Sequence, residues 1–379
     1  MIKPFKLSVS KKTLKAIYEK VKKYPWNNIE NIQGWKLGTN YNYLKKISKY
    51  WYTKYNWKKQ EDKINSLSNY ITYVNGLRIH FIKEKSSNPK SKPLLLLHGW
   101  PGSIVEFFNL IPRLAHPEKF GGKKEDGFDV IVPSLPGFGF STSTKIPIGP
   151  RKMAKIINKF MINNLKYKKY FAQGGDWGAT ISNWLAYDHS KNCKAIHINC
   201  LTMRHPKGPK TVKEKKWAIK FAKDQIMQEG YRTQQATKPQ TLSYAMIDSP
   251  VGTAAWIIEK FFSWSDLKKG NINKIYSKDL LLTNIMIYIL TKSFNTSSWV
   301  YFGRREEGGR NFPIKFNKIK VPTAIAEFPK EMSEWPPKSY VNRIFNVVRW
   351  TKMPRGGHFA ALEEPELLIR DIKSFFKKI

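Results

Sequence analysis

The chain has 379 residues and carries 67 Lys and Arg against 28 Asp and Glu, a formal net charge of +39. Hydrophobic residues make up 41% of it and aromatic residues 14%. This composition excludes a disordered or low-complexity chain and is sufficient for a real core. The length is compatible with one large domain or with a domain that contains a substantial insertion.

Several protein classes are excluded early. Two cysteines, Cys193 and Cys200, cannot form a disulfide framework and favour a reducing compartment. No apolar run reaches the roughly 18–20 residues of a membrane span, and the best candidate, 280–290, is too short. No apolar signal-peptide segment follows Met1. We therefore expect a soluble cytoplasmic protein without a transmembrane anchor.

The positive charge suggests nucleic acid as a first candidate partner. The cations are 55 Lys and only 12 Arg, however, and they are spread along the whole chain. Specific phosphate and base recognition favours Arg, and no zinc-finger spacing, RNP motif or phosphate loop is present. A solvated lysine-rich surface is therefore the preferred interpretation, with peripheral contact to anionic membranes left open and no specific nucleic acid expected.

The first element is a helical N-terminal meander, residues 1–69. Ser10 is placed to cap a helix whose apolar positions follow helical spacing, and Pro25 ends it. An aromatic and apolar stripe then predicts packing against another part of the protein: Trp35, Leu44, Ile47, Trp51, Tyr52 and Trp57. Two β-like segments flank Asn75-Gly76, which predicts a hairpin.

An alternation of strands and helices follows and predicts a mostly parallel sheet. The expected strands are 93–97, 128–132, 170–173, 193–199, 321–328 and 347–353. The expected helices between and after them are 104–114, 152–165, 177–187 and 364–379. Residues 201–312 interrupt this alternation of strands and helices and are predicted to form a mainly helical insertion. The predicted division is thus 1–69, a core of 70–200 and 313–379, and the insertion of 201–312.

A strand-to-helix turn carries the first chemical motif, Gly174-Gly175-Asp176-Trp177-Gly178. Small residues two before and two after a central residue are what a nucleophile elbow requires, because the turn is too tight for side chains there. Esterases place Ser at the centre, whereas here the central residue is Asp176. A carboxylate is poorly suited to acyl transfer but can attack a saturated carbon and form an alkyl ester. We therefore predict Asp176 as the nucleophile.

Two further motifs complete a predicted catalytic site. The loop His98-Gly99-Trp100-Pro101-Gly102 follows the leucine strand, and the backbone amides of Trp100 and Trp177 are predicted to form an oxyanion hole. His98 itself is interpreted as a structural anchor of this loop. Gly356-Gly357-His358 follows the last strand, so His358 has the chain position of a triad base.

An acid partner of His358 is expected after the strand 321–328, in Glu327-Phe-Pro-Lys-Glu331. Glu331 is the first choice and Glu327 the alternative. An ionised glutamate accepts hydrogen bonds only, so it would orient the imidazole and stabilise its cation.

Taken together, these motifs resemble those of microsomal-type epoxide hydrolases, a family with the α/β-hydrolase fold, over essentially the whole chain. The matching segments run from Pro4-Phe-Lys-Leu-Ser-Val and Trp35-Lys-Leu-Gly-Thr through His98-Gly-Trp-Pro-Gly-Ser and Pro133-Ser-Leu-Pro-Gly-Phe-Gly to Thr237-Lys-Pro-Gln-Thr, Asp248-Ser-Pro-Val-Gly and Arg355-Gly-Gly-His-Phe-Ala-Ala-Leu-Glu-Glu-Pro-Glu. The chain departs from the family at Lys330, where an apolar residue is usual before the acid.

The resemblance implies that the insertion 201–312 is a cap and that two cap tyrosines hydrogen-bond the epoxide oxygen. By motif these are Tyr231 and Tyr301, the latter next to Phe302. It also implies conversion of apolar epoxides to diols through a hydroxyalkyl ester on Asp176, with water as co-substrate and no metal or other cofactor.

Two other functions stay open from the sequence. A haloalkane dehalogenase uses the same Asp, His and acid on this fold, and Trp100 and Trp177 are compatible with a halide site. The paired tyrosines favour the epoxide. A lysine-rich binding protein on a hydrolase scaffold would need a broken triad, whereas this triad is complete in sequence.

Overall fold

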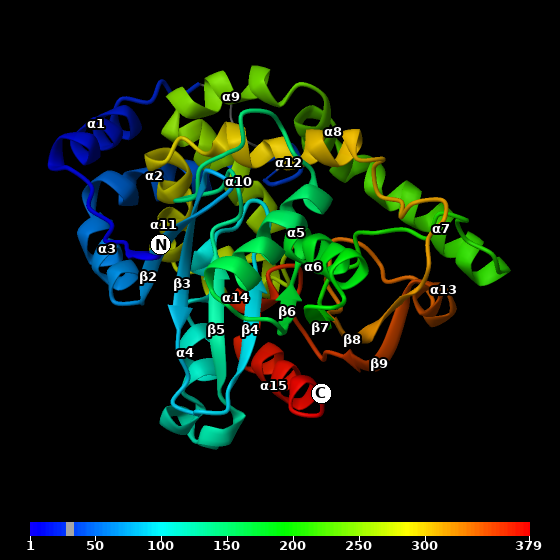
Figure 1. Ribbon diagram of the computed structural model, residues 1–379. Helices are drawn as coiled ribbons and strands as arrows, with labels where there is room; N and C mark the ends of the chain where they lie inside the picture. Colours follow the sequence, from blue (N-terminus) through cyan, green and yellow to red (C-terminus); the bar gives the residue numbers. More distant parts are fainter. Residues whose placement is uncertain (28–33) are drawn as a thin grey trace.

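The computed structural model describes residues 1–27 and 34–379, so residues 28–33 of the predicted meander lie outside the described part. Its centre is a nine-stranded sheet of order β1-β2-β3-β5-β4-β6-β7-β8-β9 (Figure 1). The strands are β1 (Lys3–Pro4), β2 (Asn69–Val74), β3 (Leu77–Glu84), β4 (Lys92–Leu97), β5 (Phe128–Pro133), β6 (Tyr170–Gly174), β7 (Cys193–Ile198), β8 (Ile319–Glu327) and β9 (Phe345–Lys352). The pairs β1-β2, β2-β3 and β3-β5 are antiparallel. All remaining neighbours, from β5-β4 to β8-β9, are parallel. The expected α/β-hydrolase fold is confirmed.

The predicted hairpin is formed by β2 and β3. Their register runs from Asn69 opposite Ile82 to Val74 opposite Leu77, which leaves only Asn75 and Gly76 in the turn. Both turn residues have positive φ, 51° and 80°. This is the geometry that matches the twist of paired strands and that Asn-Gly adopts readily.

Helices cover both faces of the sheet: α4 (Leu110–Ala115), α5 (Pro150–Lys159), α6 (Asp176–Asp188), α13 (Lys338–Ile344), α14 (Ala360–Glu363) and α15 (Pro365–Phe376). The helix expected over 104–114 is split into a 3-10 turn, Ile104–Phe107, and α4. Pro112 explains where α4 starts, since proline is tolerated only in the first turn, where no N–H donor is needed. The helix expected to reach Leu165 ends as α5 at Lys159 and continues as a π-helical turn.

The N-terminal segment contains α1 (Lys11–Lys22), α2 (Tyr41–Thr53) and α3 (Trp57–Asn65). Ser10 caps α1 by accepting a hydrogen bond from the Thr13 N–H, as predicted. Trp51 and Trp57 are fully buried, and the Trp35 ring stacks on Phe262 with 3.9 Å between centroids. The aromatic stripe therefore packs against the helical insertion.

That insertion separates β7 from β8 and contains α7 (Val212–Gln225), α8 (Glu229–Thr237), α9 (Pro239–Asp248), α10 (Pro250–Ser263), α11 (Lys278–Leu290) and α12 (Phe294–Glu306). Figure 1 shows these helices above the sheet, with α7 projecting to one side. The apolar segment 280–290 lies in α11, which is largely buried. Within the described ranges, no helix has both the length and the apolar character of a bilayer span.

Candidate active site

Asp176 lies in the strained turn between β6 and α6. Its φ is +45°, a left-handed conformation that is uncommon for residues other than glycine. A Cβ on Gly174 would approach the Gly178 carbonyl carbon to 2.3 Å, and a Cβ on Gly178 would approach the Leu97 carbonyl oxygen to 1.8 Å. Glycine is therefore required on both sides of the elbow, and the turn projects the Asp176 carboxylate beyond the carboxyl end of the sheet.

A backbone donor and a helix N-terminus lie at this carboxylate. The Trp100 N–H donates to Asp176 Oδ1 at 2.8 Å. Asp176 is also the first residue of α6, where the helix dipole favours an anion. The first intrahelical bond at this end runs from the Ala179 N–H to the Gly175 carbonyl, so the Trp177 N–H has no acceptor within the helix. Of the two amides predicted for an oxyanion hole, that of Trp100 thus lies on the loop after β4 and that of Trp177 in the first turn of α6.

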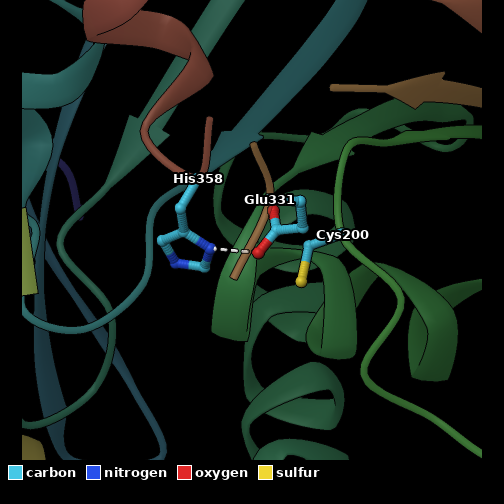
Figure 2. Close-up of side chains that lie close together, drawn as sticks. All are labelled: Cys200, Glu331 and His358. Carbon is cyan, nitrogen blue, oxygen red and sulfur yellow. Dashed lines mark hydrogen bonds and ion pairs between the residues drawn. The ribbon is translucent and has the colours of Figure 1, made fainter. Parts of the chain in front are cut away.

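His358 lies between Asp176 and Glu331. Its Nδ1 is 2.7 Å from Glu331 Oε1, and its Nε2 is 3.6 Å from Asp176 Oδ2. Figure 2 shows the imidazole pointing at the Glu331 carboxylate, with Cys200 beside it. All three triad side chains are largely or completely buried. The contacts therefore run from Asp176 through His358 to Glu331, the arrangement that a hydrolase triad requires.

The backbone around His358 is fixed by a buried carboxylate, Glu363. The Gly357 N–H donates to Glu363 Oε2 and the Phe359 N–H to Glu363 Oε1, both at 2.9 Å. The His358 N–H donates to the Trp264 carbonyl at 2.9 Å. The histidine loop is therefore tied both to α14 and to the helical insertion.

The charge state of His358 depends on its two carboxylate neighbours. Burial by itself disfavours the imidazolium, but Glu331 and Asp176 outweigh it and hold the pKa of His358 well above its ordinary value. Both neighbouring carboxylates thus favour the protonated form of the ring. Loss of the Asp176 charge would remove one of the two groups that keep the ring protonated.

The structure distinguishes the two glutamates considered as triad acid. Glu327 accepts a hydrogen bond from the Trp350 indole N–H on the neighbouring strand and is directed away from His358. Glu331 is the residue beside the imidazole. Lys330, the departure from the family pattern, is exposed and forms its backbone contacts with Gly356 and Gly357. Solvent therefore screens its charge from Glu331.

Tyr231 on α8 and Tyr301 on α12 contact the two tryptophans whose amides are predicted to form the oxyanion hole. The Tyr231 ring stacks on Trp100 at 5.3 Å, and the Tyr301 ring meets Trp177 edge-on at 4.7 Å. Burial raises the pKa of both phenols, so both hydroxyls stay protonated at neutral pH. The Tyr301 hydroxyl is buried and interacts with the side chains of Tyr231 and Trp177, although none of these contacts among the described residues has the geometry of a full hydrogen bond. It is Tyr301 rather than Phe302 that lines a cavity with Asp176.

Asp176 lines two cavities. The first is small, with a volume of about 20 Å³, and His358 and Glu106 line it too. This is enough for a single water molecule. The second is lined by Tyr231 and Tyr301. One carboxylate thus faces an imidazole on one side and two phenols on the other.

His98 is a structural residue in this arrangement, as predicted. Its Nε2 accepts a hydrogen bond from the Leu135 N–H at 3.2 Å, and its Nδ1 lies 3.1 Å from the Gly99 carbonyl. Burial lowers its pKa to about 4. A neutral imidazole therefore links the loop after β4 to the loop after β5.

Three sets of residues near the site were missed by the sequence reasoning. Burial raises the pKa of Glu106, on the 3-10 turn after the His98 loop, to about 8. Cys200, Glu331 and His358 bring three atoms of metal-ligand type within 4.8 Å of one another. The Nδ1 of His358 and Oε1 of Glu331 already bind each other, however, and burial raises the thiol pKa. Arginines line the second cavity, and no local motif marks them.

The family profile described as "Epoxide hydrolase N terminus" matches residues 2–107, and that of the "alpha/beta hydrolase fold" matches residues 92–249. Epoxide hydrolase 1 of Sus scrofa is 36% identical over 99% of this chain and 88% of its own length. The chain belongs to the epoxide hydrolase family. This epoxide hydrolase therefore has an epoxide and water as its substrates.

Other members of the family agree in fold and length. Juvenile hormone epoxide hydrolase 2 of Ctenocephalides felis is 34% identical over all of this chain and 86% of its own length. The solved structure of the Aspergillus niger epoxide hydrolase has a TM-score of 0.87 and 28% identity, covering 100% of this chain and 97% of that one. The haloalkane dehalogenase alternative is not favoured by these relatives.

Proposed function

We propose that this epoxide hydrolase acts through a covalent ester on Asp176. In the first half-reaction an Asp176 oxygen attacks an epoxide carbon, the C–O bond breaks, and the epoxide oxygen takes a proton from Tyr231 or Tyr301. The product is a hydroxyalkyl ester. The observation that carries this proposal is the placement of one carboxylate at the meeting point of a phenol-lined and an imidazole-lined cavity. An epoxide needs both a nucleophile and an acid, because its leaving alkoxide is strongly basic.

In the second half-reaction His358 accepts a proton from water, and the resulting hydroxide attacks the ester carbonyl. The Trp100 and Trp177 amides donate to the oxyanion that forms. Collapse of this intermediate breaks the ester bond and expels an alkoxide. The alkoxide takes the proton that the attacking hydroxide carried, so that a vicinal diol is released and Asp176 is again a carboxylate. Glu331 orients the imidazole and stabilises its cation. The small cavity beside His358 and Glu106 is a fitting place for the hydrolytic water.

Esterification supplies the change in His358 that the second half-reaction needs. In the free site two carboxylates hold the imidazole protonated. The ester is neutral, so only Glu331 then opposes deprotonation, and the His358 pKa falls. The proton that then leaves the ring restores the hydroxyl of Tyr231 or Tyr301, which gave its own proton to the epoxide oxygen. The base is therefore activated at the stage at which it is used.

We assign roles to the four segments on the same basis. Residues 70–200 and 313–379 form the hydrolase core that carries the triad, and residues 201–312 form a cap that carries the two tyrosines. Residues 1–69 form a meander that buttresses the cap through contacts such as Trp35 on Phe262. The reaction uses groups of this chain and water, so no metal or organic cofactor is invoked. The aromatic walls around Asp176 suit an apolar carbon skeleton next to the epoxide.

Tyrosine-to-phenylalanine variants test the acid role. Tyr231→Phe and Tyr301→Phe are each expected to lower kcat/KM for diol formation about 10- to 100-fold, because the other hydroxyl remains. The double variant should lose about 10³-fold or more, in the range of general-acid catalysis. Tyr244→Phe is the matched control, since that phenol is 69% exposed on α9. The measurement is diol formation under conditions where thermal unfolding shows every variant to be folded.

The outcome that would contradict this assignment is a double variant with near-normal kcat/KM. If Tyr231→Phe alone were impaired and Tyr301→Phe were silent, the second acid would lie elsewhere. Phe302→Leu separates the two neighbouring positions, since it should leave kcat/KM within a few-fold of the parent.

A further inference from the structure

The cavity on the tyrosine side of Asp176 has an unusually cationic lining. Arg204, Arg232, Arg304 and Arg310 all line it, and Asp176 is the one acid among its lining residues. Arg232 forms an ion pair with Glu229 one turn away, so its charge is neutralised. The other three guanidinium groups form no ion pair among the residues described. Arg304 is buried and Arg204 and Arg310 are half-buried. Charges withdrawn from water are normally paired, so three guanidinium groups without an ion pair in one cavity are unusual.

The three unpaired arginines come from separate elements that the fold brings together. Arg204 follows β7, and its backbone pairs with Arg310 and Asn311, which lie just after α12. This contact joins the two ends of the helical insertion. Arg304 is three residues after Tyr301 on α12, so the two side chains share one face of the helix. The arginine cluster therefore lines the same cavity as Tyr301 and Asp176.

Aromatic rings and backbone carbonyls, rather than carboxylates, contact the three groups, and Arg310 lies over the Phe221 ring at 5.8 Å. Arg304 lies over the Trp177 ring at 4.4 Å, and Arg204 lies over Phe221 at 4.5 Å and over Trp217 at 5.1 Å. Arg204 also donates weakly, at 3.4 and 3.5 Å, to the Met203 and Leu201 carbonyls. Stacking fixes the planes of the guanidinium groups and leaves N–H donors free.

Placing three guanidinium groups in one cavity disfavours their charged forms. Burial, followed by the neighbouring Arg310, lowers the pKa of Arg204 to about 10, and burial also lowers the pKa of Arg304 and Arg310. All three still carry their charge at neutral pH. Like charges in a poorly solvated site repel one another, and an anion bound among them would relieve both the desolvation and the repulsion.

We propose that the substrate of this epoxide hydrolase carries an oxyanion, a carboxylate or a phosphonate-type group, which Arg304, Arg310 and Arg204 bind while the epoxide lies between Asp176 and the two tyrosines. The planar fork of arginine matches both kinds of anion. The proposal rests on the function proposed above and adds a substrate class to it. The apolar part of the substrate lies between the two ends, along the aromatic walls.

Pairs of substrates that differ only in charge provide the test. An ω-epoxy carboxylic acid is compared with its methyl ester, and an epoxy phosphonate with its dimethyl ester, by kcat/KM for diol formation. The unmodified enzyme should prefer at least one acid over its ester by about 10-fold or more, the size of a charge-assisted hydrogen bond. The acid that shows the larger preference identifies the anion.

Arginine variants then test which residues cause the preference for the acid over its ester. Arg304→Gln and Arg310→Gln should each lower kcat/KM for the preferred acid by about 10- to 100-fold, mostly through KM, and change that for its ester by no more than about 3-fold. Arg305→Gln is the matched control, because Arg305 is the exposed neighbour of Arg304 on the same helix. High salt should weaken the preference of the parent enzyme and not its turnover of the ester.

Two results would overturn the proposal. One is equal kcat/KM for acids and esters in the unmodified enzyme. The other is an equal fall for acid and ester in both arginine variants, which would mean that the arginines serve the reaction centre or the fold. Failure of the proposed function looks different, since neither acids nor esters would then give diols through Asp176.

Discussion

Replacement of Asp176 by alanine is expected to lower kcat for diol formation by about 10⁴-fold or more, in line with the loss of a nucleophile from a catalytic triad. The carboxylate lies in the elbow that orients it, with the Trp100 N–H on Oδ1. Alanine leaves the backbone turn but has no atom that can form the ester. The measurement is steady-state diol formation with an epoxide at saturating concentration.

The control for this variant is Asp188→Ala at the opposite end of α6. Asp188 forms a bidentate ion pair with Arg151 at 2.7 and 2.8 Å on the surface. Its loss should leave kcat within a few-fold of the parent, since exposed ion pairs contribute little. An Asp176→Ala enzyme that is folded and retains more than about a tenth of the parent rate would contradict the nucleophile assignment.

The His358→Gln variant should separate the two half-reactions. Asp176 can still attack the epoxide, because the tyrosines and backbone donors remain, but no base activates water. One equivalent of epoxide should be consumed per enzyme, and steady-state kcat should fall by about 10³- to 10⁴-fold. The measurements are substrate depletion with excess enzyme and the mass of the protein, which should rise by the mass of the epoxide.

Glutamine at the two candidate acids gives the matched comparison. Glu331→Gln should slow ester hydrolysis strongly, because it removes the negative charge 2.7 Å from His358 Nδ1 that stabilises the imidazolium. Glu327→Gln should leave turnover near normal, since Glu327 binds the Trp350 indole instead. A larger loss from Glu327→Gln than from Glu331→Gln would reverse the assignment. Rapid turnover by His358→Gln would remove that residue from the hydrolytic step.

The elbow could be predicted from sequence because its constraints are local. Gly174 and Gly178 are required by contacts with the adjacent turn and with the end of β4, and this requirement appears directly as a spacing pattern. The hairpin at Asn75-Gly76 follows from the same kind of local requirement. The alternation of buried strands and helices likewise predicted the parallel sheet. These features depend on a few neighbouring residues.

Features that depend on distant contacts were harder to predict. The choice between Glu331 and Glu327 depends on which carboxylate the chain turns toward His358 after β8 leaves the sheet. Tyr301 and Phe302 are adjacent, and only the register of α12 decides which one faces Asp176. Glu106 belongs to the site through burial, which raises its pKa to about 8, and burial is not visible in a local motif.

The charge of the chain illustrates this difference. Its 55 lysines dominate the net charge of +39 and point to no particular site. Four of its 12 arginines, in contrast, line a single cavity beside Asp176. They are separated by up to 106 positions in sequence, so only the fold brings them together. The informative part of the charge is thus the location of a few arginines rather than the total.

The central claim, attack by Asp176 rather than by water, is tested most directly by a single turnover in oxygen-18 water with enzyme in excess. The account predicts a diol free of label, because both its oxygens then come from the epoxide and from the Asp176 carboxylate. The solvent oxygen should appear in the peptide that contains Asp176. A first-turnover diol that carries the label, with an unlabelled Asp176 peptide, would show direct attack by water and would contradict the account.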